Sequence, residues 1–452
     1  MRKDPRHIAV TVLLHWQASS QTLDRSLEKF SQTISALSKN DKNLCNALIF
    51  GVLRQRASID WILEHCSDMP LKKISPFALY LLRITLFQIL HMDRIPVFAA
   101  INTAVDIAKK TLGQKTAGFM NAVLRNACQN ASKISLPDPK KDSALFISVR
   151  YSMPLWLARK WEKTFGFETT CTLCAQINTI PDITLRVNTL KADIHCLTEL
   201  ITPHTKAVHP TVYSACGLNF TGPDTAIHEM DAFKSGLFQI QDEAAQLVTE
   251  LMAPEPCETV LDACAGLGGK TGHIAQLMNN QGSITALDID PGKLEALNLE
   301  ARRLGLHIIQ TRPVDLMQAT IKDFDTYFDR VLLDAPCSGL GVLRRNPDTK
   351  WKRTQKDIER LAAKQKKLLN AAANLVKPGG VLVYAVCSCE KEENEDVIHS
   401  FLNKRKDFSI DKNIGSDTYS VFMTDEGFLK TYPAVNTMDG FFAARLTRIS
   451  KT

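Results

Sequence analysis

The sequence lacks any apolar run of the roughly 18 to 20 residues that a membrane-spanning helix requires. Its first residues are basic, but His15 and Trp16 interrupt the apolar run that follows, and a small-residue cleavage site is missing. We therefore expect neither a secretory signal nor a membrane anchor in this sequence. We also expect a cytoplasmic protein that has no membrane partner.

The sequence also lacks the cysteine spacings of disulfide-rich and zinc-binding proteins. Its 12 cysteines are spread through 452 residues, which is typical of a long chain in a reducing compartment. The pair in "CTLC", Cys171 and Cys174, has no second CxxC partner, so zinc binding is not supported. We interpret the two residues as small apolar positions one helical turn apart, and we expect no metal.

Composition and charge point to a multidomain protein with an acidic partner. Apolar residues make up 45% of the chain and charged residues 23%, as in globular proteins, and 452 residues exceed the usual size of one hydrophobic core. The segment 1–140 holds 19 Lys and Arg against 10 Asp and Glu, whereas the remainder is nearly neutral. Such a basic segment favours a polyanion such as RNA, although a merely solvated basic face remains the alternative.

The segment 1–130 shows only helical patterns. Ser38 with Asp41 resembles a helix start, and the apolar residues that follow recur at helical spacing. Ser75 and Pro76 precede an almost wholly apolar helix, which should form the centre of a bundle. A third helix should end at Gly113, and the proline-containing, polar stretch 131–150 is typical of a linker.

The rest of the chain changes from mixed to alternating structure. Residues 151–240 combine one clear helix, "PLWLARKWEKTFG", with the short strand candidates "ITLRVNTL", "GLNFTG" and "GLFQI", and indicate a small α+β unit. Beyond residue 240, five short apolar runs alternate with helical segments, which predicts a parallel sheet covered by helices on both faces. Ligands of such sheets bind at the carboxyl ends of the strands.

Three glycines follow the first strand of this sheet in "LDACAGLGGKTGH". Gly266, Gly268 and Gly269 would allow a sharp turn and a close approach of the backbone to a ligand. The spacing fits neither GxGxxG nor the phosphate loop GxxxxGK[ST], although Lys270 and Thr271 superficially resemble the end of that loop. The glycines alone are therefore a weak signal.

Acidic residues end the strands that follow. Asp288 lies about 20 residues after the glycine turn, where a carboxylate commonly binds ribose hydroxyls. Asp315 and Asp334 end the next two runs, whereas Asp290 should point to the other face. One such aspartate is usually a helix cap, but the repetition at successive strands predicts a binding site.

Two cysteines stand at the same edge of the predicted sheet. Cys337 in "LLDAPCSGLG" and Cys387 in "LVYAVCSCEK" each follow a strand-like run and precede a serine. Pro336 and Gly339 indicate a tight turn around Cys337 rather than a packed strand. We therefore expect both thiols at the ligand crevice, unlike Cys45, which we interpret as core packing.

At this point the sequence resembles a known family. The ordered motifs "FQIQDEAAQLV", "LDACAGLGGKT", "LLDAPCSGLGVLRRNPDTKW", "LVYAVCSCEKEENE" and "DGFFAARL" resemble the RNA cytosine-C5 methyltransferases that use S-adenosyl-L-methionine. The amino-terminal helices, with "DKNLCNALIFGVLRQRASIDWIL", are similar to the NusB-type RNA-binding domain. This combination is typical of family members that methylate a cytosine of 16S ribosomal RNA.

The resemblance implies a multidomain architecture. It comprises an all-α NusB-like bundle over residues 1–135, a small α+β RNA-recognition subdomain over 150–240, and an α/β Rossmann-like methyltransferase domain over 241–452. The implied cofactor is S-adenosyl-L-methionine, and the implied partner is 16S ribosomal RNA. We further expect a monomer.

The family's chemistry assigns roles to three residues. C5 of cytosine is a weak nucleophile, so a thiolate first adds to C6, and the family's nucleophile corresponds to Cys387. The resemblance links Cys337 with release of the enzyme, and Asp334 with a hydrogen bond to the base edge near N3. The target base must leave its stack to reach them.

The family's first motif also implies the cofactor site. This chain departs from the pattern, because Gly266-Leu267 replaces Ala-Pro, which should loosen the loop, and because Val386 replaces the usual threonine before the nucleophile. The cofactor-binding residues implied by the resemblance are Cys264, Ala265, Gly266, Leu267, Gly268, Gly269, Lys270, Asp288, Asp315 and Asp334.

Several alternatives remain open in the sequence. Cys389 lies two residues beyond Cys387 and could compete as nucleophile, although the motif favours Cys387. An amino-directed methyltransferase would carry Asn/Asp-Pro-Pro-aromatic where this chain has "DAPC". An RNA-binding assembly factor without catalysis, or a methyltransferase acting on tRNA or another rRNA cytosine, are further candidates.

Overall fold

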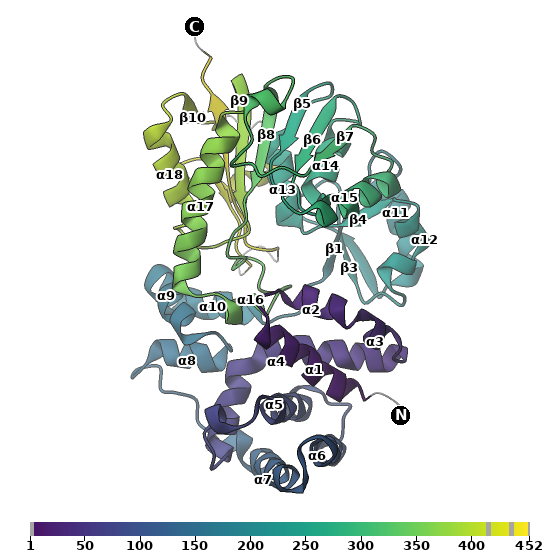
Figure 1. Cartoon of the computed structure of the whole chain (residues 1–452), viewed down its shortest axis with the longest axis vertical. Helices are drawn as coiled ribbons and strands as arrows, with labels where there is room; N and C mark the ends of the chain where they lie inside the picture. Colours follow the sequence, from purple (N-terminus) through teal and green to yellow (C-terminus); the bar gives the residue numbers. More distant parts are fainter. Residues whose placement is uncertain (1–3, 413–416, 434–437, 451–452) are drawn as a thin grey trace. The chain divides into compact units, whose positions relative to one another are not determined.

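The computed structural model describes residues 4–412, 417–433 and 438–450. The chain forms two compact units (Figure 1). One comprises the residues up to Thr179 together with Leu343–Lys352, and the other comprises Ile180–Val342 and the residues from Arg353 onward. Within the described residues, every helix is too short or too polar to cross a membrane.

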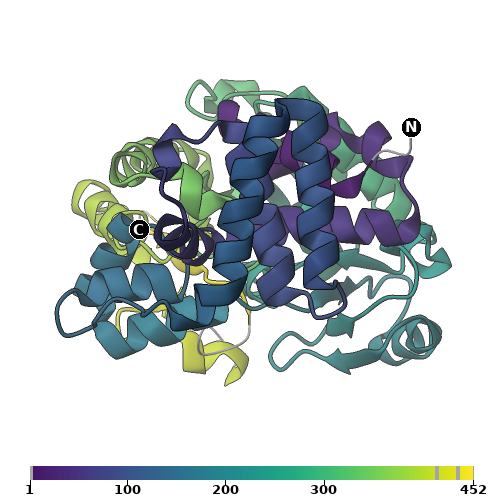
Figure 2. The same ribbon diagram turned by 90° about the horizontal axis from the view of Figure 1, so that it is seen from below.

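The first unit is helical, as predicted. The helix α5 lies at its centre and packs against α1, α4, α6 and α7. The apolar side chains of α5 are buried because these neighbours surround it. Figure 2 shows α6 and α7, in dark blue, lying side by side. The α-helices are α1 (Pro5–Ala18), α2 (Leu23–Lys29), α3 (Ser31–Ser35), α4 (Lys39–Cys66), α5 (Pro76–His91), α6 (Val97–Leu112), α7 (Gln114–Asn130), α8 (Ser143–Arg150), α9 (Leu155–Phe165), α10 (Phe167–Ile177) and, from the later segment, α16 (Thr349–Lys352).

The predicted helix boundaries hold with one difference in capping. The hydroxyl of Ser38 accepts a hydrogen bond from Asp41 N at 3.2 Å, as a capping serine should. Ser75 occupies the same position before α5, but its side chain makes no capping hydrogen bond. Gly113 ends α6 with φ +91°, a conformation that favours glycine.

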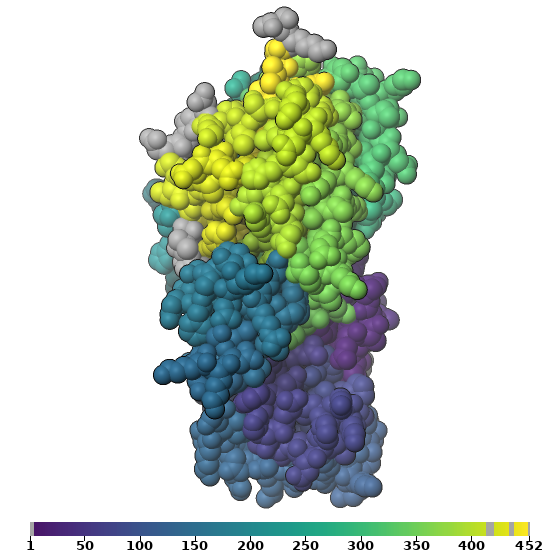
Figure 3. Space-filling model, turned by 90° about the vertical axis from the view of Figure 1, so that its left-hand side faces the viewer, coloured from purple at the N-terminus to yellow at the C-terminus, as the bar shows by residue number. Residues whose placement is uncertain are grey.

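The boundary of the helical unit differs from the one expected at residues 131–150. Residues 143–150 form α8, and the unit continues through α9 and α10. Hydrogen bonds explain the difference: Ser152 Oγ accepts from Ala57 N at 2.8 Å, and Ser58 Oγ donates to Val149 O at 2.5 Å. Figure 3 shows this part of the chain in blue against the purple of α4.

The second unit contains a small antiparallel sheet with the order β2-β3-β1-β4. Three of its strands match the predicted candidates, and β2 was missed because His209 and Pro210 interrupt its apolar pattern. Apolar residues of β1 and β3 pack against α11. The elements are β1 (Ile183–Val187), α11 (Ile194–Ile201), β2 (Ala207–Pro210), β3 (Gly217–Thr221), α12 (Asp231–Lys234) and β4 (Phe238–Ile240).

The larger sheet has the order β10-β12-β9-β8-β5-β6-β7, with β11 paired to β12. The predicted runs form β5 to β9 and pair in parallel. Helices α17 and α18 pack on one face, whereas α13 and α14 pack on the other. The elements are α13 (Glu243–Met252), β5 (Thr259–Asp262), α14 (Gly269–Leu277), β6 (Ser283–Leu287), α15 (Pro291–Leu304), β7 (Ile309–Arg312), β8 (Phe328–Asp334), α17 (Gln355–Ala373), β9 (Val376–Val386) and α18 (Glu395–Lys404).

Three carboxyl-terminal strands extend the parallel sheet, and of these only β12 runs opposite to β9, because β10 and β11 each pair antiparallel with β12. They are β10 (Phe408–Ile410), β11 (Phe428–Lys430) and β12 (Phe442–Arg448). β12 pairs antiparallel with β9 from Phe442 opposite Val386 to Thr447 opposite Val381. The sheet is therefore mixed, and β9, which leads to Cys387, is a central strand with partners on both sides.

Candidate active site

A cavity of about 370 Å³ lies at the carboxyl ends of the parallel strands, where the sheet topology places ligands. Side chains that follow β5, β6, β7, β8 and β9 all reach it. The residues that line it are Ala263, Cys264, Gly266, Asp288, Ile289, Lys293, Val314, Asp315, Leu316, Asp334, Ala335, Pro336, Cys337, Gly339, Lys364, Leu368 and Cys387.

The glycine turn shapes one wall of the cavity. Gly266 and Gly268 have φ of +56° and +84°, so an alanine at position 266, as in the family pattern, would be strained in this conformation. Gly266 N donates to Asp288 Oδ2 at 3.1 Å, which ties the turn to the end of β6. Of the ten predicted cofactor residues, Ala265, Leu267, Gly268, Gly269 and Lys270 are not among those that line the cavity.

The predicted strand-end aspartates divide into cavity residues and a helix cap. Asp288 and Asp315 line the cavity, and Lys293 Nζ lies 3.8 Å from Asp288 Oδ2. Asp290 instead caps α15, because its Oδ1 accepts from Gly292 N at 2.9 Å. Polar groups from β6 and β7 thus reach the cavity while Asp290 points elsewhere.

Asp334, the last residue of β8, forms an ion pair with Lys270 of α14. Lys270 Nζ lies 2.6 Å from Asp334 Oδ2 and 5.0 Å from the ring centre of Phe441. Burial opposes the lysine charge, but attraction to Asp334 and their hydrogen bond outweigh burial and raise the Lys270 pKa. The resulting cation holds the Asp334 carboxylate at the cavity.

Cys337 and Cys387 meet at the cavity, with their sulfur atoms 3.2 Å apart. They follow neighbouring parallel strands, in which Asp334 of β8 stands opposite Ala385 of β9. The hydrogen bond with Cys387, together with burial, raises the pKa of Cys337 well above its usual value. Cys337 therefore keeps its proton near neutral pH.

A buried glutamate connects the serines that follow these two cysteines. Ser338 N and Oγ donate to the Glu393 carboxylate at 2.8 and 2.5 Å, and Ser388 Oγ donates to it at 2.6 Å. Gln365 Nε2 donates at 3.0 Å, and Tyr384 Oη donates to Glu393 O at 2.6 Å. This group, which we call the Glu393 clamp, fixes the loops that carry both thiols.

Cys389 occupies a different environment from Cys387. It is 7% exposed, and it is not among the residues that line the cavity. Burial raises its pKa, so that its thiol stays protonated near neutral pH. The geometry therefore favours Cys387 over Cys389 as the reactive thiol.

Sequence reasoning missed several residues at or beneath the cavity. Lys293 of α15 and Lys364 of α17 line the cavity. A lysine within a helical segment of a sequence usually points into solvent, so neither was expected there. Asp262 lies fully buried under the turn, accepts a hydrogen bond from Thr271 Oγ1 at 2.7 Å, and has its pKa raised by burial to about 6. Glu393 belongs to the acidic run "EKEENED", whose side chains a sequence pattern alone predicts to be solvated. A single-sequence pattern provides no signal that separates these residues from surface charges.

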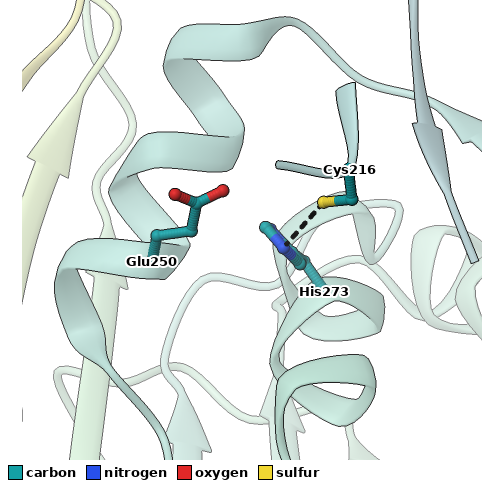
Figure 4. Close-up of side chains that lie close together, drawn as sticks. All are labelled: Cys216, Glu250 and His273. Atoms are coloured by element: carbon teal, nitrogen blue, oxygen red, sulfur yellow. Dashed lines mark hydrogen bonds between the residues drawn. The ribbon is translucent and has the colours of Figure 1, made fainter. Parts of the chain in front are cut away.

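A second cluster of polar side chains joins β3 to α13 and α14, away from the cavity. Figure 4 shows Cys216, Glu250 and His273 pointing toward one another, with Cys216 Sγ 3.8 Å from His273 Nε2. Glu250 Oε1 accepts from Ser214 Oγ at 2.7 Å. Burial and the nearby Arg186 cation lower the His273 pKa well below its usual value. Because the buried Arg186 cation would repel a metal ion bound beside it, we interpret Cys216, Glu250 and His273 as packed polar side chains rather than as metal ligands.

Comparison with known proteins agrees with this arrangement. The model of the family described as 16S rRNA methyltransferase RsmB/F matches residues 249–447. The NusB family matches residues 3–129, and the RsmF/B-like ferredoxin-like domain matches residues 153–227. Each of the three motif regions in the sequence therefore has a family counterpart.

Whole proteins and solved structures give the same result. The chain is 35% identical to the probable ribosomal RNA small subunit methyltransferase B of Bacillus subtilis, across 98% of each chain. It is 36% identical to the probable ribosomal RNA small subunit methyltransferase B of Synechocystis sp., across 94% of each. The crystal structure of PH0851 covers the whole of both chains with a TM-score of 0.82 and 25% identity. A methyltransferase homolog from Pyrococcus horikoshii has a TM-score of 0.59 at 28% identity, over 68% of this chain and 99% of that one.

The two bacterial relatives match nearly the full length of the chain, and the fold shows the same parts in the same order. The chain belongs to the ribosomal RNA small subunit methyltransferase B family, and it combines a NusB-like helical domain, a ferredoxin-like domain and a Rossmann-like methyltransferase domain.

Proposed function

We propose that this protein transfers a methyl group from S-adenosyl-L-methionine to C5 of a cytosine in 16S ribosomal RNA. The observation that carries the proposal is the pair of thiols, Cys337 and Cys387, which lie 3.2 Å apart and line a strand-end cavity. A thiol is the group that cytosine C5 chemistry requires. Family membership and the names of the two relatives support rRNA as the substrate class.

The cavity residues suit the proposed cofactor. Asp288 is held by Gly266 N at 3.1 Å and by Asp290 N at 2.9 Å, in the position where a carboxylate binds ribose hydroxyls. Asp315, at the end of the next strand, would contact the adenine, and the apolar side chains of Ile289 and Leu316 would cover its faces. When bound, the cofactor supplies the methyl group.

The protein's own residues would activate the base. The Cys387 thiolate adds to C6, and the electron pair of the C5–C6 bond becomes available at C5 for methyl transfer. Asp334, held by Lys270, hydrogen-bonds the base edge near N3. Transfer of the C5 proton to a solvent water then allows the bond between Cys387 and C6 to break, which restores the C5–C6 double bond and the thiolate and releases methylated RNA. Cys337, in contact with Cys387, assists this release.

Transfer of labelled methyl groups to undermodified 16S rRNA tests the proposal. We expect Cys387→Ala to be inactive, and Cys337→Ala to accumulate RNA that is covalently bound to protein on denaturing gels. Cys389→Ala should stay near wild-type activity, because that thiol is buried outside the cavity. Full activity of Cys387→Ala, or transfer only to tRNA, would contradict the proposal.

A further inference from the structure

The thiols of Cys337 and Cys387 are placed for a reaction with each other. Their sulfur atoms lie 3.2 Å apart, and a disulfide requires about 2.05 Å, so a movement of about 1 Å would join them. They follow β8 and β9, adjacent strands whose backbones run about 4.8 Å apart. The two sulfur atoms thus need to approach by far less than the spacing of the strands that lead to them.

The loops that carry the two thiols are also fixed relative to each other. The Glu393 clamp binds Ser338 and Ser388, whose hydroxyl oxygens lie 3.2 Å apart. Gly341 N donates to Cys387 O at 3.0 Å, which links the loops a second time. Because these contacts hold the sulfurs together before RNA binds, a second thiol is always present at high effective concentration.

Small oxidants can reach the pair. Both thiols line the strand-end cavity and are half-buried. Other cysteines of the chain differ from this pair in one property each. Cys389 is buried outside the cavity. Cys196 and Cys257 are exposed, but among the described contacts neither meets another thiol. These cysteines provide internal controls.

We propose that Cys337 and Cys387 are a reversible oxidation site that small-molecule disulfides, such as oxidised glutathione, convert into an intramolecular disulfide. The Cys387 thiolate attacks one glutathione sulfur, forms a mixed disulfide and releases one glutathione thiolate. The Cys337 thiol then loses its proton, attacks the Cys387 sulfur and releases the second glutathione. The protein pair loses two electrons and two protons, and one oxidised glutathione becomes two reduced molecules.

The consequence for activity rests on the proposed function. The disulfide removes the nucleophile and the release thiol in one step, so the oxidised protein should transfer no methyl groups. A thiol reductant should restore transfer fully. Further oxidation of Cys387 to irreversible acids should slow, because its sulfur is then held in a disulfide and is no longer a free thiolate.

Peptide mapping tests the inference directly. The full chain carrying Cys389→Ala is equilibrated in glutathione buffers of increasing oxidised share, alkylated and digested with trypsin. Residues 331–344 then carry only Cys337, and residues 368–391 carry only Cys387, because trypsin does not cut before Pro378. We expect the two peptides to be joined by a disulfide, with a mass two hydrogens below the sum of the reduced peptides. This should occur at a ratio of oxidised to reduced glutathione that leaves Cys196 and Cys257 mostly unmodified.

Cys337→Ser in the same background is the matched control. It should accumulate glutathione on Cys387, because the resolving thiol is absent. A stable glutathione adduct on Cys387 beside a free Cys337 in the Cys389→Ala protein would overturn the inference. So would a disulfide that forms only at the glutathione ratio that also modifies Cys196. The mapping result is independent of activity: an unlinked but active protein contradicts this inference alone, and a linked but inactive reduced protein contradicts the proposed function alone.

Discussion

At the scale of single residues, Glu393 explains why serine follows both cysteines. The serines provide three of the hydrogen bonds that its buried carboxylate accepts, and they connect two loops that lie far apart in the sequence. A buried carboxylate needs such donors because an unpaired charge in the interior is costly. Glu393 is therefore a positioning residue, which acts on RNA only through the thiols it aligns.

Replacing Glu393 with glutamine should lower kcat for methyl transfer by about tenfold to a hundredfold, which corresponds to about 1.4 to 2.7 kcal/mol. The amide has one acceptor oxygen, so at least one serine contact is lost and the sulfur atoms drift apart. KM for S-adenosyl-L-methionine should change little, because the Glu393 carboxyl group does not line the cavity. Initial rates at varied cofactor concentration measure both constants.

Glu392→Gln is the matched control for this change, since the neighbouring side chain keeps an oxygen for its bond from Gln355 Nε2. It should retain wild-type kcat. Equal kcat values for Glu393→Gln and wild type, or a loss that appears only in KM, would contradict the positioning role.

At the scale of elements, the segment Leu343–Lys352 is inserted between β8 and α17 yet belongs to the helical unit. Asp348 Oδ2 accepts from Trp16 Nε1 at 3.3 Å and from Leu23 N at 3.1 Å. Trp351 Nε1 donates to Leu53 O at 2.6 Å. Lys350 Nζ donates to Arg54 O at 3.1 Å inside this contact, and the lysine side chain is almost fully buried.

The buried lysine makes the stability of the helical unit depend on pH. Burial lowers the pKa of Lys350 from 10.5 to about 7, so between pH 7 and 10.5 the unfolded chain binds more protons than the folded one. Stability should therefore rise with pH, by about 2 kcal/mol from pH 7 to 9 at 1.36 kcal/mol per pKa unit. Lys350→Met should remove this rise.

Urea unfolding followed by tryptophan fluorescence measures the effect, because all five tryptophans, Trp16, Trp61, Trp156, Trp161 and Trp351, belong to the helical unit. Lys163→Met, at an exposed position of α9, should leave the slope with pH unchanged. An equal slope in wild type and Lys350→Met would show that other groups cause the dependence.

At the scale of the whole molecule, positive charge is concentrated at one end of the sequence. The segment 1–140 carries a net charge of +9 within a total of +7. Exposed lysines on α6 and α7 include Lys109, Lys110 and Lys115. In a protein of the rRNA methyltransferase B family, we expect this surplus to bind the RNA backbone by displacing counterions.

The triple change of Lys109, Lys110 and Lys115 to glutamine should weaken rRNA binding and reduce the slope of log K against log salt by about 2 to 3. Filter binding of rRNA to the full chain, between about 50 and 200 mM salt, measures this slope. The matched control changes Lys404, Lys406 and Lys412 to glutamine. These lysines are exposed in the second unit, and their loss should leave the slope unchanged. Equal slopes for both triple variants would contradict a localised interface.

The sequence by itself determined the regular helices and strands with a clear apolar period, but not β2 or α8, and it determined the edge of the sheet where the cavity lies. Helical period defined α4, α5 and α6, and apolar runs defined β5 to β9, because both patterns depend on neighbours in sequence. Strand-end polarity placed Asp288, Asp334 and Cys387 at one cavity, since parallel strands share their carboxyl edge.

Only the tertiary structure decided which distant groups meet. Glu393 reaches both Ser338 and Ser388, and Lys270 reaches Asp334, because packing of α17, α14 and the following loops brings them together. The same holds for Lys350, whose residue type and neighbours in sequence predict a surface lysine. Burial of such groups depends on contacts between segments far apart in the chain, and no periodicity within one segment encodes those contacts.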